Sequence, residues 1–155
     1  MKPTPDMFAL GLAALAVAGE WLVPLGVLPP ASIASSVSWA GAALAIAGFA
    51  LEAAAGTALG RKATPVKPFT PPTALVSDGV FGWTRNPLYV GMLVLLLGLA
   101  LALSLDWGVV LVPVLWLCLD RFVVPHEEAA LRHAFRAAFA AYAARVPRWI
   151  GLPRR

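Results

Sequence analysis

The sequence predicts an all-α integral membrane bundle of about four membrane-spanning helices, with an amphipathic C-terminal helix on the cytoplasmic side. Of the 155 residues, 60% are hydrophobic and 13% are charged, whereas soluble domains average about 45–50% apolar and about 25% charged residues. The hydrophobic residues form long runs separated by polar or Pro-containing segments. The twelve Lys and Arg residues fall at the N-terminus, in residues 61–85 and in residues 121–155.

The first predicted span covers residues 7–28 and ends at Pro29 and Pro30. This run is too long for the hydrophobic region of a signal peptide and long enough to cross a bilayer. A short uncharged, Ser-rich connection leads to a second span over residues 37–59. The many Ala and Gly residues of the second span favour close packing against another helix.

Residues 61–86 contain four prolines and four basic residues, and we expect a long polar loop. Loops of this length in a compact protein are usually functional or disordered. The third and fourth predicted spans cover residues 87–104 and 107–124. Because two residues separate them, they should form a tight antiparallel hairpin. Each span has about 18 residues, or about 27 Å of helix, near the lower limit for crossing a bilayer.

Residues 125–145 carry large apolar side chains at helical spacing and predict an amphipathic helix at the membrane interface or folded back on the bundle. Arg145, Arg148 and Trp149, at and after its end, fit an anchor at headgroup level. The positive-inside rule places the N-terminus, the 61–86 loop and the C-terminal region in the cytoplasm. The chain is thus predicted to be one multi-pass domain, residues 1–155, in a bacterial inner membrane. Its basic charge indicates topology and contact with lipid headgroups rather than nucleic-acid binding.

The segment around Asn86 and Pro87 allows two interpretations. Asn followed by Pro is a common helix start, in which case Arg85 and Tyr89 are interfacial residues and Gly91 is a packing residue. Alternatively, these residues belong to a binding site at the end of the third span. Both interpretations remain open from the residues alone.

The segment His126, Glu127 and Glu128 is similarly ambiguous. Two acidic residues in a first helical turn interact favourably with the helix dipole, yet carboxylates where a span leaves the membrane also suit a cationic or hydroxylated ligand. The two histidines and the single cysteine, Cys118, are too few and too scattered to predict a metal site.

Two acidic residues, Glu20 and Glu52, lie inside predicted spans, where a charge is costly and often functional. Their depths differ by about 10 Å, counting 1.5 Å per residue, so a direct pair would need tilted helices. Either each is protonated and bonded to a neighbouring helix, or they face the substrate. Arg121, near the end of the fourth span, is placed to reach Glu127 and Glu128 or a ligand.

Two segments together resemble one family. The run LVSDGVFGWTRNPLYVG at residues 75–91 resembles the motif G-x-Y/F-x-x-S/T-R-H/N-P-x-Y-x-G. The run EEAALRHAFRAAFAAYAARVPRW at residues 127–149 resembles E-E-x-x-L-x-x-x-F-x-x-x-Y/F-x-x-Y-x-x-R/K-V-x-R-W/F. Both motifs are similar to those of the superfamily of isoprenylcysteine carboxyl methyltransferases and phospholipid methyltransferases. The resemblance covers about residues 64–150. The first two spans are merely compatible with the family.

The resemblance implies methyl transfer from S-adenosylmethionine, with the cofactor enclosed by residues 61–91 and 121–149. It implies Arg85 and Glu128 as candidate catalytic residues. The cofactor-site residues that it implies are Val76, Gly79, Arg85, Asn86, Tyr89, Gly91, Arg121, His126, Glu127 and Glu128. This sequence departs from the family pattern at Asn86, where His is commoner. It departs also at Arg136, where the usual Gly is missing and an unbroken helix is expected.

The acceptor is left open among a prenylcysteine carboxylate, a lipid amine, a small thiol and a quinone-like molecule. We favour a lipid or lipophilic small molecule, because the extramembrane segments are short. Two other interpretations compete: an NADPH-dependent membrane reductase of the sterol-reductase type, and a non-catalytic membrane protein in which both motifs are helix caps.

Overall fold

The computed structural model describes residues 4–67 and 69–151, and the described part contains helices and irregular segments but no strand. The prediction of an all-helical chain is thereby confirmed. The elements in chain order are α1 (Pro5–Leu22), α2 (Ser36–Arg61), η1 (Gly79–Gly82), α3 (Pro87–Ala102), α4 (Asp106–Cys118), η2 (Leu119–Val123) and α5 (Val124–Arg145). The segment η1 is a short 3₁₀ helix, and η2 is a π-helical turn that joins α4 directly to α5.

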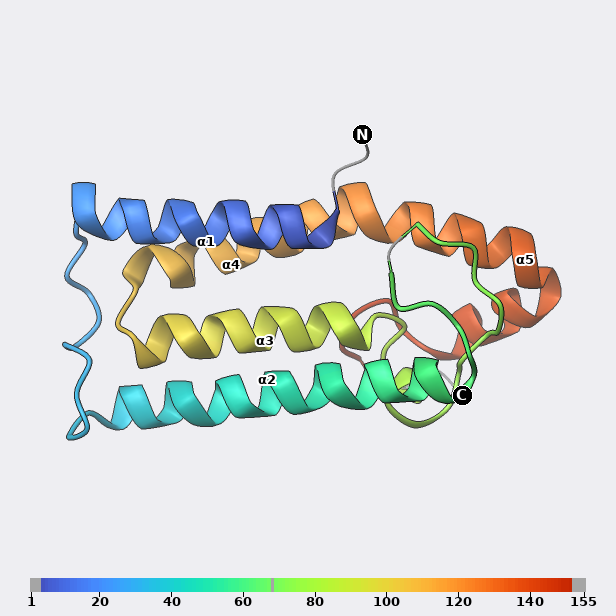
Figure 1. Cartoon of the computed structure of the whole chain (residues 1–155), viewed down its shortest axis with the longest axis horizontal. Coiled ribbons are helices and arrows are strands. Elements are labelled where there is room, and N and C mark those ends of the chain that lie inside the picture. The colour runs from blue at the N-terminus through green and yellow to red at the C-terminus, as the bar shows by residue number, and fades with distance from the viewer. Residues whose placement is uncertain (1–3, 68, 152–155) are drawn as a thin grey trace.

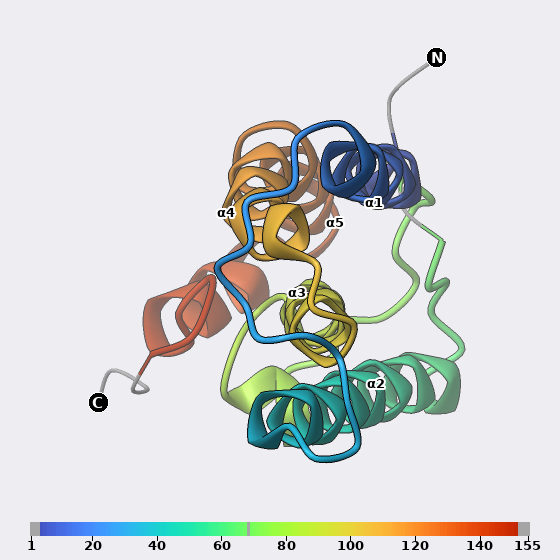
Figure 2. The same cartoon turned by 90° about the vertical axis from the view of Figure 1, so that its left-hand side faces the viewer.

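Helices α1 to α4 run side by side along the long axis of the molecule (Figure 1). Viewed along that axis, α3 lies between α2 on one side and the pair α1 and α4 on the other (Figure 2). Helix α2 packs along α3, α1 packs along α4, and α3 and α4 form the predicted antiparallel hairpin. The long loop and α5 cover one end of the bundle (Figure 1), and this end is called the loop end below.

Glycines bring α2 and α3 into backbone contact. A Cβ atom on Gly98 would lie 2.7 Å from the carbonyl oxygen of Gly41, and one on Gly91 would lie 2.8 Å from that of Gly48. These four residues occur at intervals of seven on each helix, so they face the same neighbour. Small residues let membrane helices approach closely, which confirms the role expected for the Ala- and Gly-rich second span.

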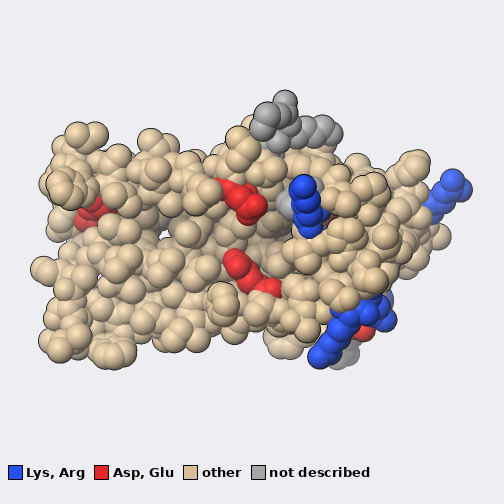
Figure 3. Space-filling view, viewed as in Figure 1, with Lys and Arg blue, Asp and Glu red and all other residues tan. Residues whose placement is uncertain are grey.

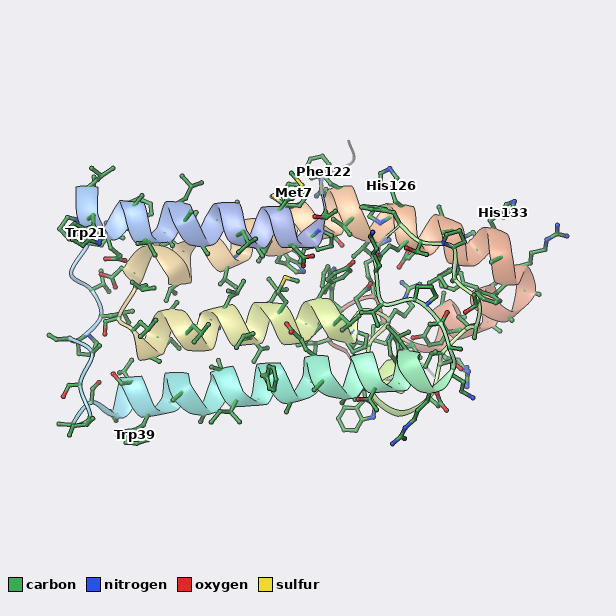
Figure 4. All side chains as sticks on the ribbon, viewed as in Figure 1. Met7, Trp21, Trp39, Phe122, His126 and His133 are labelled. Atoms are coloured by element: carbon green, nitrogen blue, oxygen red, sulfur yellow. The ribbon has the colours of Figure 1, made fainter. Side chains whose placement is uncertain are left out.

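Among the described residues, three helical stretches are long and apolar enough to cross a membrane: α1, α2 and the 40 residues from Asp106 to Arg145, in which α4, η2 and α5 follow one another directly. Helix α3 is a shorter apolar helix. In the long helix the charged residues recur from Asp120 onward, so the apolar part ends before α5. Residues 4–60 and 86–120 contain no Lys or Arg, and on the face in Figure 3 the basic side chains gather at the loop end. Trp21 and Trp39 lie at the opposite end (Figure 4), as in an interfacial aromatic belt.

The first helix is shorter than the span predicted to residue 28. It ends at Leu22, followed by Pro24, which restricts the residue before it and lacks the N–H that a helix needs. The carboxylate of Asp106 then accepts hydrogen bonds of 2.9 Å from the backbone N–H groups of Val27 and Leu28. A polar anchor on α4 thus holds this apolar segment in an irregular connection.

The unbroken helix expected from residues 125–145 is wrong. Arg136 adopts φ 40° and ψ −110°, which breaks α5, and the second part of α5 runs back toward α3 (Figure 1). This reversal lets Phe139, Tyr142 and Val146 form a buried cluster against Leu75 of the loop. Burial of the two aromatic rings therefore outweighs the backbone preference of one arginine.

Candidate functional site

A cavity of about 150 Å³ opens at the loop end of the bundle, between the 64–76 segment, the start of α3 and the first turns of α5. Seven of the residues implied by the motif resemblance line it: Val76, Arg85, Asn86, Tyr89, His126, Glu127 and Glu128. The two motifs, which are about 40 residues apart in the sequence, therefore meet around one space.

Three residues implied for the same site lie elsewhere. Gly79 starts η1 with φ 57° and open space around it, so it serves a turn. Gly91 faces α2, where an added Cβ would meet the Cγ atom of Glu52 at 2.6 Å; this is the packing role that the sequence left open. Arg121 points outward with 69% of its side chain exposed, and its Nε lies 3.7 Å from an oxygen of Asp120.

Glu128 is buried between arginines. Arg148 binds both of its oxygens, through Nε at 3.1 Å and Nη2 at 2.8 Å, and Nη2 of Arg85 lies 3.2 Å from Oε1. The hydrogen bond to this carboxylate raises the pKa of Arg148 above its ordinary value. A carboxylate that is 7% exposed needs such partners, since burying an unpaired charge is costly. Glu128 is thus a junction that fixes both arginines.

The segment after α5 is bound to the residues around the cavity by side-chain hydrogen bonds. Nη1 of Arg148 and Nε1 of Trp149 donate to the same oxygen of Asp120, at 3.1 and 2.8 Å. The carbonyl oxygen of Arg148 accepts hydrogen bonds from Asn86 Nδ2 at 2.8 Å and from Thr84 Oγ1 at 3.0 Å. These contacts tie the residues before α3 to η2, and the prediction of a headgroup anchor at Arg148 and Trp149 did not include them. The R-W pair at the end of the second motif, Arg148 and Trp149, was the signal available.

The side chain of Asn86 does not cap α3. It occupies the N-cap position without accepting a hydrogen bond from the helix, and its amide instead donates to the segment after α5. The simple helix-cap interpretation therefore does not describe this residue.

Tyr89 and Glu127 form a second polar pair on the cavity wall. The Tyr89 hydroxyl donates a hydrogen bond of 2.7 Å to Oε1 of Glu127. Burial raises the pKa of Glu127 above its usual range, while the hydrogen bond from Tyr89 acts in the opposite direction. A neighbouring ring nitrogen, Nδ1 of His126, lies 2.9 Å from the carbonyl oxygen of Phe122, along the upper side of α5 (Figure 4). The other oxygen of Glu127 has no hydrogen-bond donor among the described residues, so it can accept from a ligand.

Arg85 carries a buried Nε atom with no hydrogen-bond partner among the described residues. A buried unpaired donor costs about 1–3 kcal/mol, and this side chain lines the cavity. An anionic group in the cavity could satisfy this donor once the guanidinium turns toward it. Arg85 and Glu127 therefore place one unpaired donor and one free acceptor at the wall of the cavity.

The two intramembrane acids do not line this cavity. An oxygen of Glu20 accepts a 2.7 Å hydrogen bond from the backbone N–H of Trp107, so Glu20 caps the start of α4 at the end opposite the loop end. Glu52 is half-buried on α2, next to Gly91 of α3. The described residues contain no group of three or more His, Cys, Asp or Glu that could hold a metal ion.

Comparison with known families matches residues 37–138 to the model of the phospholipid methyltransferase family. The match runs from α2 to just beyond the break in α5 and covers more than half of the chain. Neither the curated proteins nor the solved structures yielded a match.

Proposed function

The chain belongs to the phospholipid methyltransferase family, and from this premise we propose that it transfers a methyl group from S-adenosylmethionine to a lipophilic acceptor in the membrane. The observation that carries the proposal is the cavity in which Arg85 and Glu127 present an unpaired donor and a free acceptor. We extend the proposal to the whole chain as one domain, with this cavity as the cofactor site.

The chemistry of the cavity wall fits the cofactor. S-Adenosylmethionine carries an ammonium, a carboxylate, two ribose hydroxyls and a sulfonium. Glu127 would accept from the ammonium or the ribose, and Nε of Arg85 would donate to the carboxylate, since charge-assisted hydrogen bonds are the stronger kind. Phe81, Leu88 and Phe139 supply an apolar wall for the adenine.

The cavity is smaller than the roughly 300–1,000 Å³ that pockets for molecules of this size usually occupy, so its roof should move outward on binding. The roof consists of residues 64–67 and 69–75. Oγ1 of Thr64 accepts from the backbone N–H groups of Thr73 at 3.0 Å and Ala74 at 3.1 Å, and the hydroxyl of Thr73 donates to the carbonyl oxygen of Ala63 at 2.8 Å. Exchange of these amides should slow when the cofactor fills the cavity.

The cofactor supplies an electrophilic methyl group. The residues of this chain need only hold the two reactants in line and keep water away, because proximity and orientation alone supply several kcal/mol of the barrier. This requirement explains a site built from positioning contacts, with Glu128 fixing Arg85 and Tyr89 fixing Glu127. Arg85 and Glu128 are accordingly our candidates for the residues on which turnover depends most.

We also propose the orientation of the chain. The basic residues at the loop end favour a cytoplasmic position for that end. The cofactor site and both termini would then lie in the cytoplasm of a bacterial cell. Helix α5 would then lie at the interface of the inner membrane. A polar cofactor would arrive from the cytosol and an apolar acceptor from the bilayer.

Calorimetric titration of the detergent-solubilised protein with S-adenosylhomocysteine and with NADPH tests the proposal. S-Adenosylhomocysteine should bind, and Arg85→Ala and Glu128→Gln should each weaken its binding about tenfold or more, on the order of 1.4 kcal/mol. The matched control is Arg121→Ala, which removes a nearby cation that points away from the cavity and should bind like the parent. Binding of NADPH alone would favour a reductase, and binding of neither a non-catalytic protein.

A further inference from the structure

A second hollow lies inside the bundle, away from the cofactor site. It is a recess of about 160 Å³ between α1, α3 and α4, and every residue that lines it is Ala, Gly, Val or Leu. Nothing in the proposed cofactor chemistry uses it. The recess therefore needs an explanation of its own.

Small side chains and helix arrangement create the recess. Ala9, Ala13 and Ala16 line it from one face of α1, and Gly108 lines it from α4. Helix α1 packs along α4 rather than along α3, so a gap between α1 and α3 is left open to the outside. The gap appears as a hollow between the upper and lower helices in the left half of Figure 3. Ala13 and Leu99 are exposed at its mouth.

The recess is connected to the cofactor cavity by one apolar cluster. Leu115 of this cluster lines the recess and Tyr89 of the same cluster lines the cavity, while Leu12 and Leu96, which line the recess, pack against the cluster. Along α3, Tyr89 and Leu96 are seven residues apart, or about 10 Å. A molecule lying in the recess thus has one end near the wall of the cofactor cavity.

We propose that the recess binds one aliphatic chain of a membrane lipid, with the headgroup end toward Tyr89 and the methyl end toward Leu103. That this lipid is the methyl acceptor rests on the proposed function. The recess offers a water molecule no hydrogen-bond partner, so water should not occupy it. Its mouth opens between membrane-spanning helices, where the surrounding medium is hydrocarbon. A comparable apolar cavity of about 150 Å³ accommodates benzene.

The recess would orient the aliphatic chain of the lipid rather than bind it tightly. Lipid tails are as apolar as the leucines around them, so association inside a bilayer depends on packing and not on hydrophobic transfer. From Ala9 to Val17 the recess follows about 12 Å of helix, which sets how deep a chain can extend. The recess would therefore orient the whole lipid, so that the acceptor headgroup is held at the loop end, near the cofactor.

Photolabelling tests this arrangement. The protein is placed in phosphatidylcholine nanodiscs that contain a phosphatidylethanolamine with a diazirine near either the carbonyl or the methyl end of one acyl chain. We expect the carbonyl-end probe to label α3 near Leu96 and the methyl-end probe to label it near Leu103. Ala13→Phe, which fills the mouth, should lower this labelling about fivefold, on the order of 1 kcal/mol. Ala14→Phe, on an exposed part of α1 that does not line the recess, should leave it unchanged.

Uniform labelling of the outer faces of α1 and α2, or the reverse order of depth, would overturn the proposal. Titration with S-adenosylhomocysteine separates it from the proposed function. A protein that binds S-adenosylhomocysteine but is labelled uniformly has a cofactor site and no chain site. A protein that is labelled in the recess but binds no S-adenosylhomocysteine has a chain site, and its lipid is not a methyl acceptor.

Discussion

The hydroxyl of Tyr89 donates a 2.7 Å hydrogen bond to Oε1 of Glu127, which joins the first turn of α3 to the first turn of α5. The Tyr89 ring packs in the apolar cluster that contains Leu119 and Val123. One residue thereby links the apolar core of the bundle to the wall of the cavity at the loop end. The pair fixes where the Glu127 carboxylate points before any ligand arrives.

Tyr89→Phe should lower the free energy of unfolding by about 1 kcal/mol, because the ring is kept and a buried hydrogen bond is lost. Thermal unfolding in detergent measures this loss. Glu127→Gln is the companion variant: its amide oxygen still accepts from Tyr89, so most of the stability should remain. It should nevertheless weaken S-adenosylhomocysteine binding about tenfold, or about 1.4 kcal/mol. Equal stability of Tyr89→Phe and the parent would show that the hydrogen bond contributes nothing.

Arg148→Lys should destabilise the protein although the charge is kept. A guanidinium spans both oxygens of Glu128 and also reaches Asp120, and a single ammonium cannot reproduce this fork. We expect a loss of about 1.5–3 kcal/mol, the range for hydrogen bonds to charged groups. Arg145→Lys is the control, because Arg145 is exposed. If the two variants melt at the same temperature, the role assigned to the Arg148 fork is wrong.

The sequence predicted most of what depends on hydropathy and on the two motifs. The predicted spans overlap the helices, and Arg85, Tyr89, Glu127 and Glu128 do line one cavity. Apolar runs identify membrane helices because lipid leaves the backbone no alternative partner. Motif residues far apart in sequence were brought together by the hairpin of α3 and α4.

What the sequence could not predict depends on long-range polar contacts. The path of the chain after α1 depends on Asp106. Its carboxylate binds the backbone of Val27, although the two residues are 79 positions apart in the sequence. The place of Arg148 depends on Glu128 and on Asn86, 62 residues earlier. Local pattern contains no information on such pairs, so Arg148 looked like a surface anchor. Gly91, conversely, matched a site motif and yet packs against α2.

Gly48→Ala should separate α2 from α3. A Cβ at this position would meet the backbone of Leu95 and, at 2.7 Å, the carbonyl oxygen of Gly91. Because both neighbours are backbone atoms, they cannot move aside cheaply, and overpacking of this kind costs about 1–3 kcal/mol. Gly56→Ala, on the same helix with open space around it, should be neutral or slightly stabilising, since Ala is the better helix former. The melting temperature should therefore fall for Gly48→Ala and stay the same or rise for Gly56→Ala. Equal shifts would contradict the backbone contact between α2 and α3.

Arg136→Gly should stabilise the protein. At φ 40° and ψ −110°, Arg136 holds a backbone conformation that a residue with a Cβ rarely adopts, and such residues cost of order 1–3 kcal/mol. Glycine reaches this region readily. Because the Arg136 side chain is exposed, its removal should cost few stabilising contacts. Ala134→Gly, two residues earlier in regular helix, should instead cost about 1 kcal/mol. Opposite shifts in melting temperature are therefore expected from the same introduced residue. If both variants lose stability, α5 is continuous in solution and the break at Arg136 is wrong.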